Sequence, residues 1–194
     1  MMEDMKIVGV DEAGRGPLAG PVAVGLVCAA HDFSFRRSFP KLNDSKQLSE
    51  AVRERLFERL EKYVALGKVK YAVLMRSAQE IDERGIAVVI REAIEEGLGS
   101  LLIPGEGKVW LDGALSAPAV YEQETVIGGD GKIPAIMLAS IAAKVVRDRH
   151  MRTLHEVHSL YGFDAHKGYG TKAHFEAIRT HGICDIHRKT FVHV

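Results

Sequence analysis

The sequence predicts an α/β protein in which helices flank a mixed β-sheet, with a small helical part at the carboxyl end. Short runs rich in β-branched residues alternate along the chain with longer runs that carry apolar residues at helical spacing. The 194 residues suit one compact domain, and 46% of them are hydrophobic, which is enough for a core without disulfides or metals. We therefore expect one structural unit, with a main domain over residues 1–160 and a helical extension over residues 161–194 packed on it.

The first half of the chain is predicted to contain two strands, a helix and a third strand. The two strands cover residues 6–10 and 21–29 and form an antiparallel pair around a glycine-rich turn. Ser49 is expected to cap a helix that extends to about Ala65 and carries an apolar stripe. The third strand is expected at residues 69–74.

The second half is predicted to be richer in helix. Ser77 and Glu80 have the spacing of a capping box, which opens a helical segment that resumes after Gly85. Pro134 suits the first turn of the longest helix, and Gly182 suits the end of the last one. The expected elements are a strand at residues 109–111, a strand at residues 120–127, a helix from Pro134 to about His158, and a helix that begins after Thr171.

The composition excludes several classes of protein. No apolar run approaches the roughly 18 residues of a membrane span, and the amino terminus, which contains Glu3 and Asp4, lacks the pattern of a signal peptide. Cys28 and Cys184 are too few for a disulfide framework or a zinc site. We expect a protein that resides in a reducing cytoplasm and does not associate with a membrane.

Charge is unevenly distributed although the formal net charge is zero. Residues 141–194 contain nine Lys or Arg against five Asp or Glu, whereas residues 1–140 contain 17 against 21. Eight of the nine histidines also lie in the last stretch. This asymmetry fits an acidic metal-binding half joined to a basic half that grips an anionic substrate, and a chance imbalance of surface charge explains it equally well.

Four carboxylates lie where strands are predicted to end or a helix to begin, namely Asp11, Glu12, Asp112 and Asp130. Sites in open α/β sheets assemble at the ends of strands, and hard divalent cations such as Mg²⁺ prefer oxygen ligands. Turn chemistry is the simpler explanation for any single Asp beside Gly. The adjacent acids Asp11 and Glu12, however, repel each other unless a cation or base balances them. The set therefore indicates a metal site, at which two ions could activate water and stabilise the leaving oxygen of a phosphodiester.

Gly14, Arg15 and Gly16, here called the glycine loop, directly follow the acid pair. Its backbone N–H groups could bind a phosphate or a sugar hydroxyl, and Arg15 adds positive charge. A tight turn between two strands would explain the glycines alone. The position beside the acids favours contact with a substrate.

Several blocks of sequence resemble the ribonuclease HII (type 2 ribonuclease H) family, in that family's order and over the whole chain. The first block is GVDEAGRGPLAGPV at residues 9–22. The others are residues 43–49, 81–83, 111–113, 140–148, 166–171 and 187–191.

The resemblance implies a ribonuclease H-like fold, with residues 1–160 as the catalytic domain, and a metal-dependent endoribonuclease. Such an enzyme hydrolyses the RNA strand of RNA–DNA hybrids and cuts 5′ of single ribonucleotides embedded in duplex DNA. The reaction uses two metal ions and leaves a 5′-phosphate and a 3′-hydroxyl. The resemblance further implies a cytoplasmic monomer that holds two Mg²⁺ or Mn²⁺ ions on Asp11, Glu12, Asp112 and Asp130.

The resemblance also implies how the sugar is recognised. The glycine loop is expected to sense the ribose 2′-hydroxyl, and Tyr169 to pack beside the sugar that follows the ribonucleotide. The related type 3 enzymes lack arginine in this loop, so Arg15 favours type 2.

Four further side chains are expected to contact substrate phosphates. Ser140 and Lys144 lie on one face of the long helix together with Asp148, because these residues recur at every fourth position. The structural alternative is an ordinary surface ion pair between Lys144 and Asp148. Lys46 and Lys167 are the other two candidates. Contacts between such side chains and phosphates fix the position of the protein on the nucleic acid and do not read its base sequence.

The sequence departs from the family pattern beside Asp130. Gly128 stands where a lysine is common, and Gly131 stands where a serine often follows. Two glycines loosen a loop, so they put the placement of Asp130 in question.

The histidines are expected to have structural roles. His155, His158 and His174 lie on predicted helices, at their surfaces and without mutual ligand spacing, so no zinc site is expected. His187 and Arg188 are expected to tie down the tail or to touch DNA.

Two other functions remain open. A metal-dependent DNA nuclease of the same fold class would use the acids but would not need a 2′-hydroxyl sensor beside them. A non-catalytic nucleic-acid-binding module would not need to keep all four acids.

Overall fold

The computed structural model describes residues 5–193, so Glu3 and Asp4 lie outside the described residues. Its sheet has the strand order β3-β2-β1-β4-β5. Strand β2 pairs antiparallel with β1 and β3, whereas β4 pairs parallel with β1 and β5, so the predicted mixed sheet is confirmed. The strands are β1 Lys6–Ala13, β2 Val22–Ala30, β3 Val69–Arg76, β4 Gly107–Asp112 and β5 Glu122–Val126.

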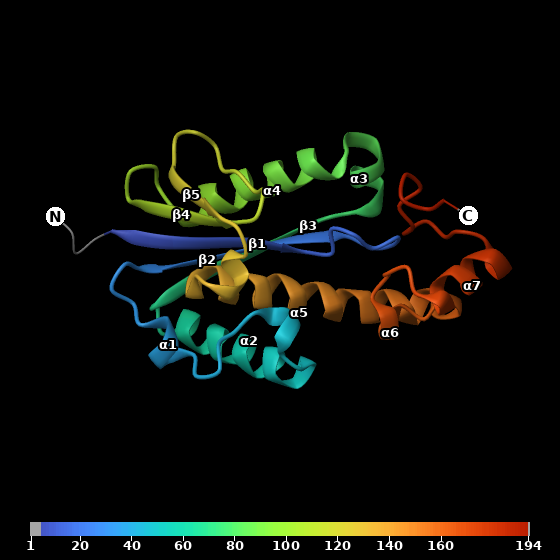
Figure 1. Cartoon of the computed structure of the whole chain (residues 1–194), viewed down its shortest axis with the longest axis horizontal. Helices are drawn as coiled ribbons and strands as arrows, with labels where there is room; N and C mark the ends of the chain where they lie inside the picture. Colours follow the sequence, from blue (N-terminus) through green and yellow to red (C-terminus); the bar gives the residue numbers. More distant parts are fainter. Residues whose placement is uncertain (1–4, 194) are drawn as a thin grey trace.

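Helices cover both faces of the sheet (Figure 1). Helix α4 (Ile86–Leu101), which follows the short α3 (Ala78–Arg84), packs on one face. Helix α5 (Pro134–Val157) packs on the other face, with α2 (Glu50–Ala65) outside it. The shorter helices are α1 Phe35–Ser38, η1 Ser45–Gln47, η2 Gly129–Gly131, η3 Ser159–Tyr161, α6 Phe163–His166 and α7 Lys172–His181.

The alternation of side chains along β1 sets the position of the site. Val8 and Val10 lie in the core under α4, whereas Ile7 packs toward α5. Gly9 lies on the α5 face, where a Cβ would come within 2.1 Å of the backbone of Ala135. Successive strand residues point to opposite faces, so Asp11 shares the α5 face with Gly9.

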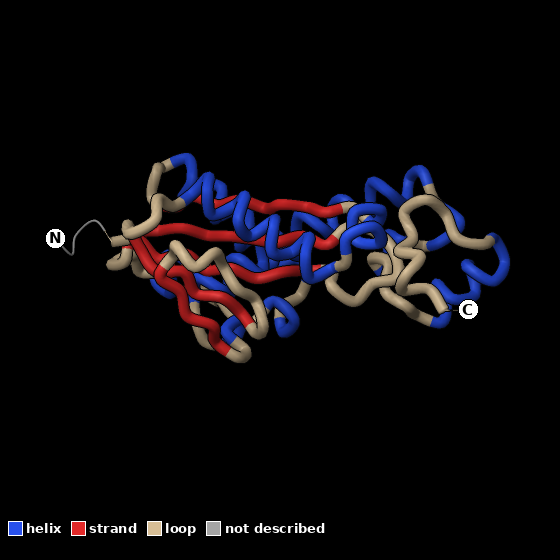
Figure 2. Tube along the Cα trace, turned by 90° about the horizontal axis from the view of Figure 1, so that it is seen from above, coloured by secondary structure: helices blue, strands red, loops and turns tan. Residues whose placement is uncertain are grey.

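The carboxyl-terminal part is built on the end of α5 that extends beyond the sheet (Figures 1 and 2). Phe163 and Ile178 form a small core there with Met151 of α5. Leu18 and Ala19, from the turn between β1 and β2, are buried in the same cluster. The turn that carries the glycine loop is therefore packed against the carboxyl-terminal part.

Several element boundaries differ from the predicted ones. Strand β1 continues to Ala13, because its pairing with β2 extends to Ala23, so Asp11 and Glu12 lie within the strand and not after it. Strand β5 begins only at Glu122. Helices α1, η1 and α6 were not predicted, since three or four residues are too few to show helical periodicity.

The predicted helix starts can be checked at their caps. The capping box of Ser77 and Glu80 is present, and the Thr171 side chain accepts a hydrogen bond from the backbone of His174. Ser49 occupies the N-cap position of α2 but its side chain makes no capping hydrogen bond. No helix in residues 5–193 is long and apolar enough to cross a membrane.

Candidate active site

Three of the four predicted acids meet at the end of the sheet. The parallel register aligns Val10 of β1 with Leu111 of β4, which makes Asp11 and Asp112 neighbours on adjacent strands. Asp130 joins them from η2, between β5 and α5. Carboxylate oxygens of these three residues lie within 4.8 Å of one another, close enough to share a divalent cation.

The glycine-rich stretch holds Asp130 in place despite its departure from the family pattern. Gly128 adopts a left-handed conformation with a φ of 66°, which glycine tolerates without strain. The backbone N–H groups of Gly129 and Asp130 then donate to Oδ1 of Asp112, at 2.6 and 3.3 Å. Asp112 therefore organises the turn that brings Asp130 into the cluster.

The electrostatics of the cluster favour a cation. The pKa of Asp11 is raised to about 7, chiefly by burial and also by the charges of Glu12 and Asp112, although a hydrogen bond from Ser140 opposes the rise. Lys46 Nζ lies 2.7 Å from Oδ2 of Asp130, and this contact raises the pKa of Lys46. One ammonium group does not neutralise three clustered carboxylates, and these oxygens are the ligands that Mg²⁺ and Mn²⁺ prefer.

Glu12 lies at the edge of this cluster. It is not among the three acids whose oxygens converge, because its side chain points to the other face of β1. Its carboxylate pairs instead with Nη1 of Arg15 at 3.3 Å. Glu12 can thus orient Arg15, and it contributes a fourth carboxylate beside the cluster.

A groove of about 400 Å³ joins the acids to most of the predicted substrate contacts. It brings together Asp11, Glu12 and Asp112 with Gly14, Arg15, Gly16, Lys46, Ser140, Lys144 and Tyr169, and it is also lined by Ala13, Ser45 and Arg53. Segments from five parts of the chain, at residues 11–16, 45–53, 112, 140–144 and 169, therefore form one surface.

Two buried arginines hold the glycine loop and the turn that follows it. Arg188 donates to the backbone carbonyls of Gly14, Arg15 and Gly20, at 2.7, 2.9 and 2.9 Å. Arg147 donates to the carbonyls of Pro21, Ala19 and Lys167. The expectation that Arg188 ties down the tail is confirmed, since it fixes residues 188–192 to the glycine loop.

The two glycines of the loop have different roles. Gly14 has a φ of 85°, and a Cβ there would lie 1.9 Å from the side chain of Arg147. Gly16 has neither a left-handed φ nor any atom within 4 Å of an added Cβ. The backbone conformation therefore requires glycine at position 14, whereas at position 16 glycine leaves space that opens on the groove.

Helix α5 presents the predicted polar face. Lys144 Nζ lies 2.9 Å from Oδ1 of Asp148, which is buried. The same ammonium group lies 5.7 Å from the ring centre of Tyr169, whose side chain is 41% exposed. Ser140 shares a 2.9 Å hydrogen bond with the hydroxyl of Ser45, so η1 is anchored to α5 beside the acids.

Lys167 lies apart from these residues. It is buried, has a left-handed backbone, and directs its ammonium group to the carbonyl of Asp164. It is not among the residues that line the groove. Its role as a phosphate contact stays a prediction, but the bond to the Asp164 carbonyl makes it a weaker candidate than Lys144.

His174 corrects the expectation of surface histidines. Its side chain is fully buried, with Nδ1 3.0 Å from the carbonyl of Tyr169 and Nε2 3.1 Å from Nε2 of His187. Because a carbonyl only accepts, Nδ1 of His174 must donate. His174 therefore supports the loop that carries Tyr169.

Ser45 and Arg53 are groove residues that the sequence reasoning missed. Arg53 donates to the carbonyls of Ser45 and Leu48, so it links α2 to η1. The sequence did point to Ser45, because this residue lies within one of the blocks that resemble the family, residues 43–49. Arg53 lies on a helix face with other charged residues, and nothing in the local pattern distinguishes it.

The sequence of this chain is similar to those of known proteins of a single family. A family model for Ribonuclease HII matches residues 8–194. Ribonuclease HII of Bacillus anthracis (strain CDC 684 / NRRL 3495) is 45% identical over 186 residues, which is 95% of this chain and 68% of the relative. Ribonuclease HII of Bacillus cereus (strain AH820) is 44% identical over the same length.

Solved structures of related enzymes have the same fold. Ribonuclease H2 from Pyrococcus horikoshii OT3 superposes with a TM-score of 0.77 at 30% identity, covering 96% of this chain and 93% of that one. RNase HII in a PCNA complex from Archaeoglobus fulgidus gives a TM-score of 0.76 at 26% identity, covering 98% and 96%. Bst-RNase HIII in complex with Mn²⁺ gives 0.67 at 16% identity, covering 94% and 64%, and shows likeness of fold alone.

The mixed sheet, with carboxylates on its neighbouring central strands, defines a nuclease of the ribonuclease H-like fold class. Within that class, the chain belongs to the ribonuclease HII family. It is a metal-dependent endoribonuclease, and family membership supports cleavage of the RNA strand of RNA–DNA hybrids.

Proposed function

We propose that this enzyme, beyond cleaving RNA–DNA hybrids, cuts on the 5′ side of single ribonucleotides embedded in duplex DNA and leaves a 5′-phosphate and a 3′-hydroxyl. One observation carries the proposal. The glycine loop lines a single groove with Asp11 and Asp112 of the carboxylate cluster, because β1 delivers Asp11 and the chain then turns directly into Gly14. A sugar bound to the loop would therefore lie beside the phosphate that the acids act on.

Asp11, Asp112 and Asp130 are the residues that would hold Mg²⁺ or Mn²⁺, with Glu12 at the edge of the site. Two such ions, when bound, would supply an activated water and stabilise the leaving oxygen. The raised pKa of Asp11 supports this assignment, because an acid that is hard to ionise alone is stabilised by a nearby cation.

The glycine loop would recognise the ribose through its backbone. The N–H groups of Arg15 and Gly16 have no hydrogen-bond acceptor among the described residues, whereas the carbonyls of Gly14 and Arg15 accept from Arg188. The free N–H groups can therefore donate to a 2′-hydroxyl, the group by which proteins distinguish RNA from DNA. Arg188 holds the carbonyls of this backbone, and Arg147 holds the turn that follows it.

Tyr169 and the polar face of α5 would position the rest of the strand. The exposed ring of Tyr169 lies beside Lys144, so a sugar on the ring would have its phosphate near the ammonium group. Ser140 and Lys46 line the same groove on the side of the acids. Such contacts set the register of the substrate and do not read base sequence.

We also propose that residues 161–194 form one structural unit with residues 1–160, and that the enzyme works as a monomer. The first point is supported by hydrogen bonds from Leu18 N to the Gly168 carbonyl and from Arg188 N to the Leu18 carbonyl. A single cooperative unfolding transition, independent of protein concentration, is the expected result. Separate transitions, or a midpoint that rises with concentration, would contradict it.

The direct test is a cleavage assay on duplex DNA that contains one ribonucleotide, run in Mg²⁺ and in Mn²⁺, with the all-DNA duplex as control. We expect metal-dependent cutting at the ribonucleotide and none of the control. Cutting of both duplexes would favour a DNA nuclease. Binding without cutting in either metal would favour a non-catalytic module.

A further inference from the structure

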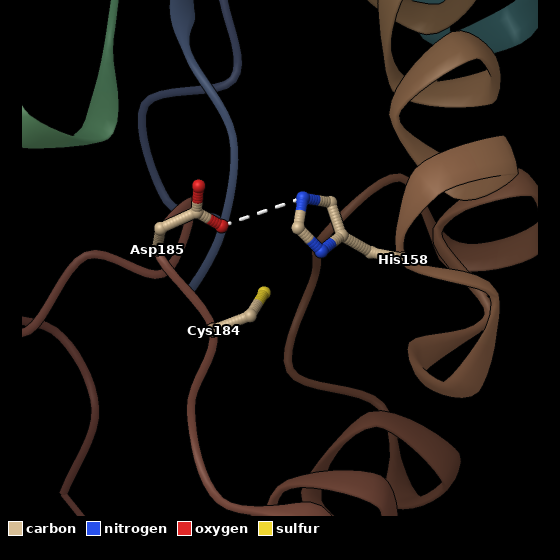
Figure 3. A group of neighbouring side chains, drawn as sticks. All are labelled: His158, Cys184 and Asp185. Atoms are coloured by element: carbon tan, nitrogen blue, oxygen red, sulfur yellow. Dashed lines mark ion pairs between the residues drawn. The ribbon is translucent and has the colours of Figure 1, made fainter.

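A second group of metal-binding side chains lies in the carboxyl-terminal part, away from the acids. It consists of His158, which follows α5, and of Cys184 and Asp185, which follow α7 (Figure 3). One nitrogen, one sulfur and one oxygen atom from these residues lie within 4.8 Å of one another. The imidazole, thiol and carboxylate all point into the same space, although His158 comes from a different segment than the adjacent residues Cys184 and Asp185 (Figure 3).

The distance between the imidazole and the carboxylate is that of a tetrahedral site. Nε2 of His158 lies 3.4 Å from Oδ1 of Asp185. Ligand atoms around a tetrahedral Zn²⁺ lie about 3.3 to 3.8 Å apart, given bond lengths of about 2.0 to 2.3 Å. The nitrogen and the oxygen already have this separation, whereas the sulfur, which contacts Nδ1 of His187 at 3.1 Å, would have to move to reach it.

The three side chains differ in exposure and in how they are held. The His158 side chain is 17% exposed, and its ring packs edge-on against Phe163. The Asp185 side chain is 80% exposed, so it can adjust to a cation. Cys184 is held by its backbone N–H, which donates to Nδ1 of His187 at 2.9 Å.

The chemistry of the donors indicates which cation would bind. A thiolate, an imidazole and a carboxylate form a borderline-soft set, which prefers Zn²⁺ and Co²⁺ to Mg²⁺. The catalytic cluster offers oxygen atoms alone and has the opposite preference. The two sites would therefore be occupied by different metals.

We propose that His158, Cys184 and Asp185 form a binding site for Zn²⁺, separate from the catalytic metals. The thiol of Cys184 releases its proton to solvent as the sulfur–metal bond forms. Three protein ligands complete most of a tetrahedral shell, and a water molecule would supply the fourth ligand. The convergence of the three donor atoms carries this proposal.

Bound zinc would fasten the segment after α7 to the end of α5. That segment also contacts the turn between β1 and β2, through the hydrogen bond from Gly20 N to the carbonyl of Ile186 at 2.8 Å. Arg188, which holds the glycine loop, lies three positions beyond Asp185. The site would thus stabilise the part of the molecule that supports the loop, without contacting the substrate.

The experiment uses Co²⁺ as an optical probe on the full chain after treatment with a chelator. One equivalent of Co²⁺ is expected to produce a thiolate-to-cobalt absorption band in the near ultraviolet, which Zn²⁺ then abolishes by displacement. Cys184→Ser should remove the band, and His158→Ala and Asp185→Asn should each weaken Co²⁺ binding by at least about tenfold. Zn²⁺ should raise the Tm of the parent protein but not that of Cys184→Ser.

Two matched controls separate this site from other metal binding. Cys28→Ala removes the other cysteine, which is buried in the main core, and should keep the band. Asp11→Asn alters the catalytic cluster and should also keep it. Circular dichroism confirms that each variant is folded, and Asp185→Asn is the most conservative of them because the side chain is exposed. Absence of the band in the parent protein, its loss in Asp11→Asn, or its persistence at full affinity in both His158→Ala and Asp185→Asn would overturn the proposal.

Discussion

The guanidinium of Arg188 donates a 2.7 Å hydrogen bond to the backbone carbonyl of Gly14, a residue 174 positions earlier in the chain. The same side chain reaches the carbonyl of Arg15, and it is fully buried. The carboxyl-terminal segment thereby determines the conformation of the loop beside the catalytic acids. The glycine loop, near the start of the chain, therefore depends on a residue near its other end.

Replacing Arg188 with lysine should impair the recognition of single ribonucleotides. A lysine ammonium group is a compact point charge and cannot reproduce the fork that bridges two carbonyls. We expect slower cleavage of a single-ribonucleotide duplex with the fold retained, measured by single-turnover kinetics and circular dichroism. Arg179→Lys, on the exposed face of α7, is the matched control and should be unchanged. Equal rates for Arg188→Lys and the parent protein would show that the loop does not need this support.

Asp11→Asn should abolish cleavage and stabilise the metal-free protein at high pH. The pKa of Asp11 is about 7 in the folded chain, against a reference value of about 3.8. At pH values between these two pKa values, folded Asp11 keeps a proton that unfolded Asp11 has released. The contribution of Asp11 to stability is therefore complete below pH ~4 and is lost as the pH rises through about 7. Asparagine does not ionise, so the Asp11→Asn variant does not lose this stability as the pH rises. Urea unfolding at pH 5 and pH 8.5 should show a gain for the variant only at the higher pH, and a gain of equal size at both would contradict the assignment.

Lys144 and Lys167 should differ in the salt dependence of duplex binding. Each phosphate contact contributes about one unit to the slope of log affinity against log salt. Lys144→Ala should flatten the slope by about one unit, since its ammonium group faces the groove. Lys167→Ala should change it little, because that ammonium group is bound to the carbonyl of Asp164. Fluorescence anisotropy at several salt concentrations measures both slopes, and a larger change for Lys167→Ala would reverse the assignment.

The buried histidines should make the protein less stable at low pH. Burial lowers the pKa of His174 to about 4, and it also lowers the pKa of His166 and of His187. Between about pH 6.5 and pH 4 the unfolded chain takes up a proton that folded His174 does not, so stability falls as the pH falls through this window, by up to about 3 kcal/mol for this group.

The test of this effect is His174→Asn, whose amide can still donate to the carbonyl of Tyr169 but does not titrate. Its free energy of unfolding, measured by urea denaturation, should depend less steeply on pH between 4 and 6.5 than that of the parent protein. The same steepness in both proteins would show that His174 is not the group responsible.

Sequence reasoning predicted the order of strands and helices because local periodicity and turn residues specify them. It could not predict that β1 extends past Asp11, since this depends on pairing with β2. It also gave Arg147 no role, because the bonds of that side chain reach Pro21 and Ala19, far away in the chain. The acids and the glycine loop were found because they are local motifs. The burial of His174 and Lys167 was missed because it depends on tertiary packing.

We propose above all that the backbone of the glycine loop senses the ribose. An added Cβ at position 16 meets no atom of the protein and opens on the groove, so Gly16→Ala should keep its stability while holding the substrate away from the loop. Arg15→Ala removes only a half-exposed side chain, which pairs with Glu12. The most direct measurement compares the cleavage rates of both variants on a duplex with a single ribonucleotide and on a continuous RNA–DNA hybrid. We predict that Gly16→Ala loses more activity at the single ribonucleotide than Arg15→Ala does. A larger loss in Arg15→Ala would show that the loop acts through charge, and it would contradict recognition by the backbone.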